Sequence, residues 1–552
     1  MNDSLDWLHT PISRRALLAS AAASAVLAAC TSKNSSDDAA TVNRENVKPT
    51  LDDHVLRRVT FGPTESLIGA LQTSGASAYL QAQLHPESGD SDEVATVLAG
   101  FKTLQLSPAE RREQYSADNV RGVLSQELMG ATLVRAVASP WQLFEVMVDF
   151  WSNHLNIYQS PSYGPYTKPT DDQEVIRAHA LGRFSDLLQA SAQSPAMLDY
   201  LDNKDSRADG DNTPNENYAR ELLELHTVGV DGGYTETDIR SAAHVLAGWS
   251  IDDDTLLFEF RADWHAMTGT EQVMGWSADG LTGIDAGMSL LRYLARHENT
   301  ALHLSEKLCR RFVADDPDQD LIDNVANAYL DNDTDIPSTL AAIFSSPQFA
   351  SARRTKVRRP FEIVAASLRS VDATFDPKKA QQLGEWSQFV LTSMGQPLFK
   401  WPPPNGYPDT ATTWMNAGAM LMRWNYAQNL GATTQGVFSI DWRPWRRSDR
   451  GRHPRLRRRV GPAARSRSAH TSRTGGDNRV SGGCRRERSK PHAPRSKRRR
   501  TAVGESCLPT PVARSSFTSS CAAGWTPSAP SYPWATPRTG RPDRRALFPM
   551  MS

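Results

Sequence analysis

The chain has 552 residues, 39% of them hydrophobic, and a formal net charge of zero at pH 7. Its five cysteines include no C-x-x-C pair, which argues against a disulfide scaffold and a zinc finger. No G-x-G-x-x-G, P-loop or G-x-S-x-G segment occurs, which argues against nucleotide-binding α/β folds and against an acyl-transfer serine elbow.

The zero net charge is a cancellation between two parts of the chain. Residues 437–552 hold 27 Lys and Arg against 6 Asp and Glu, whereas residues 1–436 hold 35 against 56. Such an asymmetry within one chain calls for an explanation of its own.

The N-terminus has the layout of an export signal. Ser13-Arg14-Arg15 precedes an apolar run of 14 residues, which ends in Leu27-Ala28-Ala29-Cys30. Paired arginines indicate the twin-arginine route, and the last four residues resemble a lipobox with Cys30 as the lipid acceptor. The run is shorter than the roughly 20 residues that span a bilayer. We therefore expect a signal peptide over 1–30, a flexible linker over 31–48, and an exported lipoprotein anchored to the membrane by a lipid on Cys30, on the extracytoplasmic side (periplasm or cell surface).

Apolar residues at helical spacing dominate residues 49–436 and predict a mainly α, large multi-helix domain with at most a short β-hairpin, at 256–264. Ser139-Pro140 is expected to open a helix over 141–157, and Thr235 a capping box for a helix that ends before Gly248. Further helices are expected at 53–72, 172–191, 217–228, 287–296, 302–313, 318–330, 337–344, 359–371 and 415–430.

Residues 437–552 lack helical or strand periodicity, and arginine outnumbers lysine by 25 to 2 there. This composition predicts a basic disordered tail, because it offers too little apolar surface to offset the ordering entropy. A nucleic-acid-binding tail and a frameshift in a GC-rich gene both explain it. The shortage of lysine and the exported destination favour the frameshift and argue against a nucleic-acid partner. The domain over 49–436 would then be incomplete at its C-terminal end.

A polar helix start at 215–226 (NENYARELLELH) is the first candidate site. Arg220 and Glu224 are four residues apart and are expected to form a structural ion pair beside an apolar stripe. The candidate catalytic residues are Glu216, Glu221 and His226. An ordinary amphipathic helix with surface ion pairs is the alternative.

The preceding loop resembles a calcium loop. Counted from Asp205, oxygen-bearing side chains fall at positions 1, 5, 7, 9 and 12, and Gly210 falls at position 6. The candidate ligands are Asp205, Asp209, Asp211 and Glu216. Arg207 and Pro214 depart from the pattern, so an ordinary turn loop is the alternative.

Scattered histidines are the third candidate site. His154 lies at an aromatic helix end, and together with His265 and the glutamates near 216–221 it would supply ligands for a divalent transition metal. Without H-E-x-x-H or other local spacing, a structural role for each histidine is the alternative.

Several motifs together resemble the bacterial "domain of unknown function 1800" family, over roughly residues 50–430. They are HVLRRVTFGP from His54, FWSNH from Phe150, PNENYARELLELHTVG from Pro214, DGGYT from Asp231, AGW from Ala247, Lys356 through Phe361, GQPLF from Gly395 and WPPPNGY from Trp401. The resemblance implies an exported, mostly helical protein of unestablished function, with a second exported protein encoded nearby as a plausible partner. His265-Ala266-Met267-Thr268-Gly269 departs from the family's His-Asp-x-Gly pattern, and the basic tail stands where more helix is expected.

These observations favour a metal-dependent extracytoplasmic hydrolase, with calcium or a divalent transition metal as its cofactor. The alternative is a non-catalytic cell-envelope binding or assembly protein.

Overall fold

The computed structural model describes residues 51–440, except 88, 117, 160–161, 266, 354, 431–435 and the side chains of 118–121. All of these residues belong to the first of two units, 1–460, and the second unit, 461–552, is outside the described part. The predicted signal peptide with Cys30, the linker and almost all of the basic tail also lie outside the described residues. Within the described part, no helix is long and apolar enough to cross a membrane.

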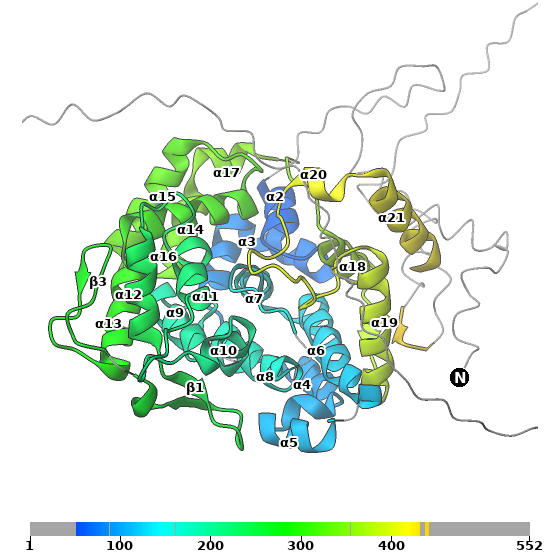
Figure 1. The fold of residues 1–552 in the computed structure, drawn as a ribbon. Coiled ribbons are helices and arrows are strands. Elements are labelled where there is room, and N and C mark those ends of the chain that lie inside the picture. Colours follow the sequence, from blue (N-terminus) through cyan, green and yellow to red (C-terminus); the bar gives the residue numbers. More distant parts are fainter. Residues whose placement is uncertain are drawn as a thin grey trace, which may run out of the picture. The chain divides into compact units, whose positions relative to one another are not determined.

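The described chain is mainly α-helical, which confirms the predicted fold class (Figure 1). The α-helices are α2 Leu51–Arg58, α3 Glu65–Leu84, α4 Asp92–Leu98, α5 Pro108–Gln114, α6 Asp118–Ala138, α7 Gln142–His154, α8 Gly164–Thr170, α9 Phe184–Ala192, α10 Pro195–Tyr200, α11 Asn217–Glu221, α12 Glu236–Leu246, α13 Gly283–Ala295, α14 Glu298–Phe312, α15 Gln319–Asp331, α16 Ile336–Ser345, α17 Pro347–Ser351, α18 Pro360–Ser370, α19 Ala380–Ser393, α20 Ala411–Trp414 and α21 Ala417–Leu430. The 3₁₀ turns are η2 Lys102–Gln105, η4 Asn203–Asp205, η6 Ala262–Trp264 and η7 Pro377–Lys379, and the π-helical turns are η3 Asp171–Arg177 and η5 Leu222–His226.

Three short two-stranded antiparallel sheets accompany the helices in the described part, where one hairpin was expected. They pair β1 Trp249–Ile251 with β2 Phe258–Phe260, β3 Gln272–Val273 with β4 Trp276–Ser277, and β5 Thr374–Phe375 with β6 Phe438–Ser439. The prediction of a hairpin within 256–264 was wrong in its partner, since Phe258–Phe260 pairs with the segment just after Gly248 and 3₁₀ turn η6 follows it.

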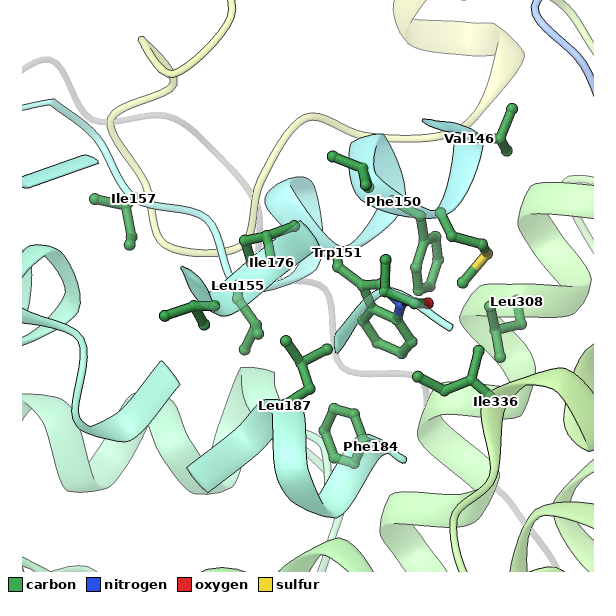
Figure 2. Packing of buried hydrophobic residues seen from close by; sticks show 14 of the residues in the cluster. Val146, Phe150, Trp151, Leu155, Ile157, Ile176, Phe184, Leu187, Leu308 and Ile336 are labelled. Atoms are coloured by element: carbon green, nitrogen blue, oxygen red, sulfur yellow. The ribbon is translucent and has the colours of Figure 1, made fainter. Parts of the chain in front are cut away.

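Helix α7 lies in the middle of the helices (Figure 1) and is buried on most of its faces. Trp151 packs against Phe184, with ring centroids 5.5 Å apart, and Leu308 and Ile336 lie nearby (Figure 2). The indole N–H of Trp151 donates to the carbonyl of Ala180 at 3.0 Å, so the largest side chain of this core is also satisfied as a donor. The core thereby fixes the C-terminal end of α7 in place.

The other helices pack against one another in pairs. Helix α6 packs along α19, α14 packs on α15 and α15 on α16, and α13 lies against α9 and α12. This arrangement brings the C-terminal half of α14 beside the end of α7, although the two are more than 150 residues apart in the sequence.

The expected helix over 53–72 is two helices, α2 and α3. Pro63 has no N–H to continue the helical ladder, and Gly62 lies so close to α18 that a Cβ on it would be 2.9 Å from the Cα of Ala366. The expected helix over 172–191 also divides, into η3 and α9, because Arg183 leaves the helix and pairs with Asp335 in a β-bridge.

Helix starts were predicted with mixed success. The capping box of Thr235 and Asp238 and the helix to Leu246 are confirmed, and Gly248 follows with φ of +80°. The prediction that Ser139 begins this helix was wrong by two residues. Its hydroxyl accepts from the N–H of Trp141, and the helix begins at Gln142, because Ser139 and Pro140 form the turn before it.

Candidate functional site

A polar pocket of about 230 Å³ lies at the C-terminal end of α7. Its walls come from the end of α7, the last turns of α14, the start of α18 and the loop at 405–410. The lining residues are Phe150, Asn153, His154, Lys307, Arg310, Arg311, Arg359, Asn405, Tyr407, Pro408, Asp409 and Thr410. Four of these side chains are cationic and one, Asp409, is a carboxylate, so we refer to this site as the cationic pocket.

Helix α14 presents three of these cations because of their spacing. Lys307, Arg310 and Arg311 are three and four residues apart and therefore share one helix face. Leu304 and Leu308 continue the same stripe into the core, so Arg311 occupies a position where an apolar residue is usual.

The loop after Trp401 closes the pocket and is fastened to the end of α7. The amide of Asn153 donates to the carbonyl of Tyr407 at 2.9 Å and accepts from its N–H at 2.7 Å. Asn156 donates to the carbonyls of Trp401 and Pro403 at 3.0 and 2.8 Å. A Cβ on Gly406, whose φ is +70°, would lie 2.1 Å from the carbonyl oxygen of Asn153, so this approach requires glycine.

Lys307 and His154 are in direct contact. The Nζ of Lys307 lies 2.8 Å from Nδ1 of His154, and Nε2 of His154 lies 3.1 Å from the carbonyl oxygen of His226. A carbonyl only accepts, so Nε2 carries the proton and Nδ1 accepts from the lysine. Among the described residues, no carboxylate lies within ion-pair distance of Lys307. Burial and the neighbouring Arg310 lower its pKa to about 8, against the opposing effect of Glu306.

His154 is the centre of a histidine cluster with His226 and His303, at ring centroid distances of 6.3 and 6.2 Å. Burial and then Lys307 lower the pKa of His226 to about 3 and that of His303 to about 4. The same causes hold the pKa of His154 well below its usual value. The three imidazoles are therefore neutral at pH 7. Nε2 of His226 is buried and has no hydrogen-bond partner among the described residues.

A buried ion cluster supports the opposite wall of the pocket. Arg311 donates to Glu362 at 2.5 Å, and Arg359 pairs with both Asp149 and Glu362. Burial opposes the ionisation of Glu362, but Arg311, Arg359 and Arg58 together outweigh it and hold its pKa well below the usual range. Glu362 thus pairs with two guanidinium groups and lies near a third, Arg58, while Asp149 is a second carboxylate on Arg359.

The polar helix predicted from residues 215–226 is present, with a different second half. Helix α11 continues into the π-helical turn η5, and Glu216 stands before its first turn. Arg220 contacts Glu216 at 3.4 Å, Glu224 at 3.7 Å and Glu236 at 2.8 Å. The exposed fractions of these four side chains are 33, 34, 24 and 62%, so this cluster faces solvent.

The three candidate catalytic residues do not share one site. His226 is buried beside His154, whereas Glu216 belongs to the solvent-facing ion cluster. Glu221 is half-buried, and burial followed by the nearby charge of Glu224 raises its pKa against the effect of Arg220.

The acidic loop places its candidate calcium ligands against cations of the chain itself. Asp205 pairs with Lys204, and Asp209 accepts from Arg207 at 2.7 and 2.5 Å and from Asn212. Asp211 is exposed. Across the part of the chain that the structure describes, no group of three or more His, Cys, Asp or Glu side chains is arranged to hold a metal ion.

His265 lies apart from His154 and is fixed by two backbone groups. Its Nδ1 donates to the carbonyl of Ala247 at 2.8 Å, and its Nε2 accepts from the N–H of Gly283 at 2.9 Å. Both ring nitrogens are used, and this hydrogen bonding ties the segment after β2 to the start of α13.

Sequence reasoning missed most of the charged residues of the cationic pocket, namely Lys307, Arg310, Arg311, Arg359 and Asp409. It also missed His303 of the histidine cluster. One signal was available, because Arg311 continues the stripe of Leu304 and Leu308. Asn405 and Tyr407 lie in the WPPPNGY motif, Arg359 lies between Lys356 and Phe361, and Asn153 and His154 lie in FWSNH, so three of the family motifs line the pocket.

Comparison with known proteins gives one match. The family model described as "Protein of unknown function (DUF1800)" matches residues 54–515, which is well over half of the chain and extends beyond residue 436. No curated protein and no solved structure matches the chain.

Proposed function

Because this chain belongs to the DUF1800 family, whose function is unknown, we propose a function from its own pocket: it is a cell-envelope protein that binds a small oxyanion, a carboxylate or phosphate group, in the cationic pocket. The volume of this pocket, about 230 Å³, is below the roughly 300–1,000 Å³ of pockets that bind drug-sized ligands. It therefore suits one small ligand or the end of a longer one.

Within the described part of the chain Lys307 lacks a counter-ion, and this observation carries the proposal. Arg311 and Arg359 are neutralised by Glu362 and Asp149, but among the described residues the amine of Lys307 contacts a neutral imidazole and no carboxylate. A part-buried charge without a counter-ion is unfavourable, and an oxyanion in the pocket would relieve this cost. Oxyanion binding would also raise the pKa of the amine.

The test is calorimetric titration of the full chain with inorganic phosphate and, separately, with succinate. We expect binding of at least one, at least about 10-fold weaker in Lys307→Met, which equals about 1.4 kcal/mol. The exposed Lys102 provides the control variant Lys102→Met, which should bind as the parent does. Binding should also weaken as the pH rises above about 8, where the amine loses its proton. Equal affinity in the Lys307→Met variant, or no binding of either anion, would overturn the proposal.

The hydrolase expected from the sequence is a second candidate, supported by the raised pKa of Glu221. A half-buried carboxyl with a raised pKa suits a general acid. The test is hydrolysis of nitrophenyl ester and phosphate probes, with and without added calcium or zinc. Glu221→Gln should keep the melting temperature and abolish any metal-dependent turnover. Lost folding in this variant would indicate a structural role instead.

The proposal also places the protein outside the cytoplasm, on the strength of the twin-arginine segment and Cys30. Labelling of cells with a palmitate analogue should mark the parent chain and not Cys30→Ala, and the variant should leave the membrane fraction. Labelling of both chains would contradict lipidation at Cys30. The second exported protein suggested by the family resemblance is the partner to seek by cross-linking in the envelope.

A further inference from the structure

A second, smaller cavity of about 30 Å³ shares two wall residues with the cationic pocket, Asn153 and Tyr407. Asp149, Ser152, Asn156 and Asp172 also line it, so oxygen-bearing side chains dominate its polar surface. We refer to it as the acidic pocket. Its volume is sufficient for one small polar group.

Two buried oxygen atoms of the acidic pocket residues have no hydrogen-bond partner among the described residues. They are Oδ1 of Asp172 and Oγ of Ser152. Asp172 is 1% exposed, and its other oxygen accepts from Arg177 at 3.2 Å. Buried polar atoms are nearly always satisfied in folded proteins, so these two indicate a place for a hydrogen-bond donor.

The charges around the two pockets are opposite in sign. On the acidic side, the single guanidinium of Arg177 is shared by Asp172 and Glu145, at 3.2 and 2.6 Å, which leaves one negative charge in excess. On the cationic side, Lys307 has no carboxylate partner within the residues that the structure describes. The Asn153–Tyr407 hydrogen bonds lie in the wall that the two pockets share.

We propose that the two pockets form one site for a zwitterion, in which the cationic pocket takes the oxyanion and the acidic pocket takes a protonated amine. A primary ammonium offers three donors. Oδ1 of Asp172 and Oγ of Ser152 supply two acceptors, and the carboxylate of Asp149 stands in the same wall. This inference rests on the proposed oxyanion binding and adds the second charged group of the ligand, which makes the ligand class a small amino acid or an amino-terminated acid.

The test compares a series of ω-amino acids, from glycine to 6-aminohexanoate, with the carboxylates of equal length that lack the amine. We expect one member of the series to bind the full chain at least about 10-fold more tightly than its matched carboxylate. Ser152→Ala should remove part of that difference and leave the affinity for the carboxylate unchanged. Because Oγ of Ser152 has no hydrogen-bond partner in the described part of the chain, this variant should fold normally. Exposed Ser345 gives the control Ser345→Ala.

Asp172→Asn is the stronger variant, since it replaces an acceptor with a donor at nearly constant volume. It should abolish the advantage of the amino acid, and its melting temperature shows whether the Arg177 contact is retained. If every amino acid binds no more tightly than its carboxylate, the zwitterion inference fails while oxyanion binding stands. If the carboxylates do not bind either, the proposed function itself fails. An undiminished advantage in folded Asp172→Asn would also overturn the inference.

Discussion

Two ion clusters of this protein are near mirror images in composition and differ in burial. At Arg220, one guanidinium contacts three carboxylates on a solvent-facing surface. At Glu362, one carboxylate pairs with two guanidinium groups and lies near a third, and its side chain is 6% exposed. Sequence spacing pointed to the first cluster, but the second one builds the wall of the pocket. The comparison shows that the burial of a charged side chain, more than its spacing from other charges in the sequence, determines how much its removal destabilises the fold.

The largest effect on stability should come from Glu362→Gln, which would leave Arg311 without its carboxylate partner and Arg359 with Asp149 alone. Removing one partner of a buried ion pair destabilises a protein by about 3–5 kcal/mol. Urea unfolding of the full chain measures this. Glu306→Gln, which removes a part-exposed partner of Arg310, is the matched control and should change stability by at most about 1 kcal/mol. Equal losses in the two variants would remove the distinction between the clusters.

The second-largest effect on stability is expected at acidic pH, through His226 at the buried end of the polar helix. The pKa of His226 is about 3 in the folded protein, below the ordinary 6.5 of the unfolded chain. The folded state therefore resists protonation, and the stability due to this group is complete above pH 6.5 and declines as the pH falls toward 3. At pH 5 the loss is about 2 kcal/mol. Comparison of His226→Asn with the parent at pH 7 and pH 5 measures it, and the prediction fails if the variant shows the same decline.

Arg220→Ala should cost about 1 kcal/mol or less, because its partners lie at a surface where ion pairs are weak. The effect should shrink further in about 1 M salt, where the screening length is about 3 Å. Thermal melts of the parent and of Arg220→Ala at low and high salt measure the loss of stability and its dependence on salt. A loss that matched that of Glu362→Gln, or that persisted in high salt, would show that the exposed cluster behaves as a buried one.

Added calcium should have the smallest effect on the stability of the protein. Asp205 and Asp209 are already engaged by Lys204 and Arg207, so a cation must displace both before it binds the loop. We expect added calcium to leave the melting temperature of the chelator-treated chain unchanged. The calcium loop inferred from residue spacing makes the opposite prediction, a rise with calcium concentration by mass action, and metal analysis by mass spectrometry after dialysis decides between them.

The sequence was a good guide to local structure and a weaker one to the site. Helical periodicity and the Thr235 capping box predicted elements whose causes are local, whereas the break at Gly62 depends on Ala366, about 300 residues away. The pocket could not be predicted for the same reason, since His154 comes from α7 and the cations come from α14 and the start of α18. Spacing finds groups on one helix face, but it cannot find partners that only tertiary packing brings together.

The fastening of the loop after Trp401 to the end of α7 has a consequence for the order of folding. Asn153 and Asn156 are synthesised some 250 residues before the carbonyls and the N–H that satisfy them. A nascent chain that stops before Trp401 would therefore carry these amides without their partners and an open pocket. Ligand binding at the pocket would then indicate that the chain has been synthesised and folded as far as this loop. Such an indicator would suit a chain whose predicted export route carries folded proteins.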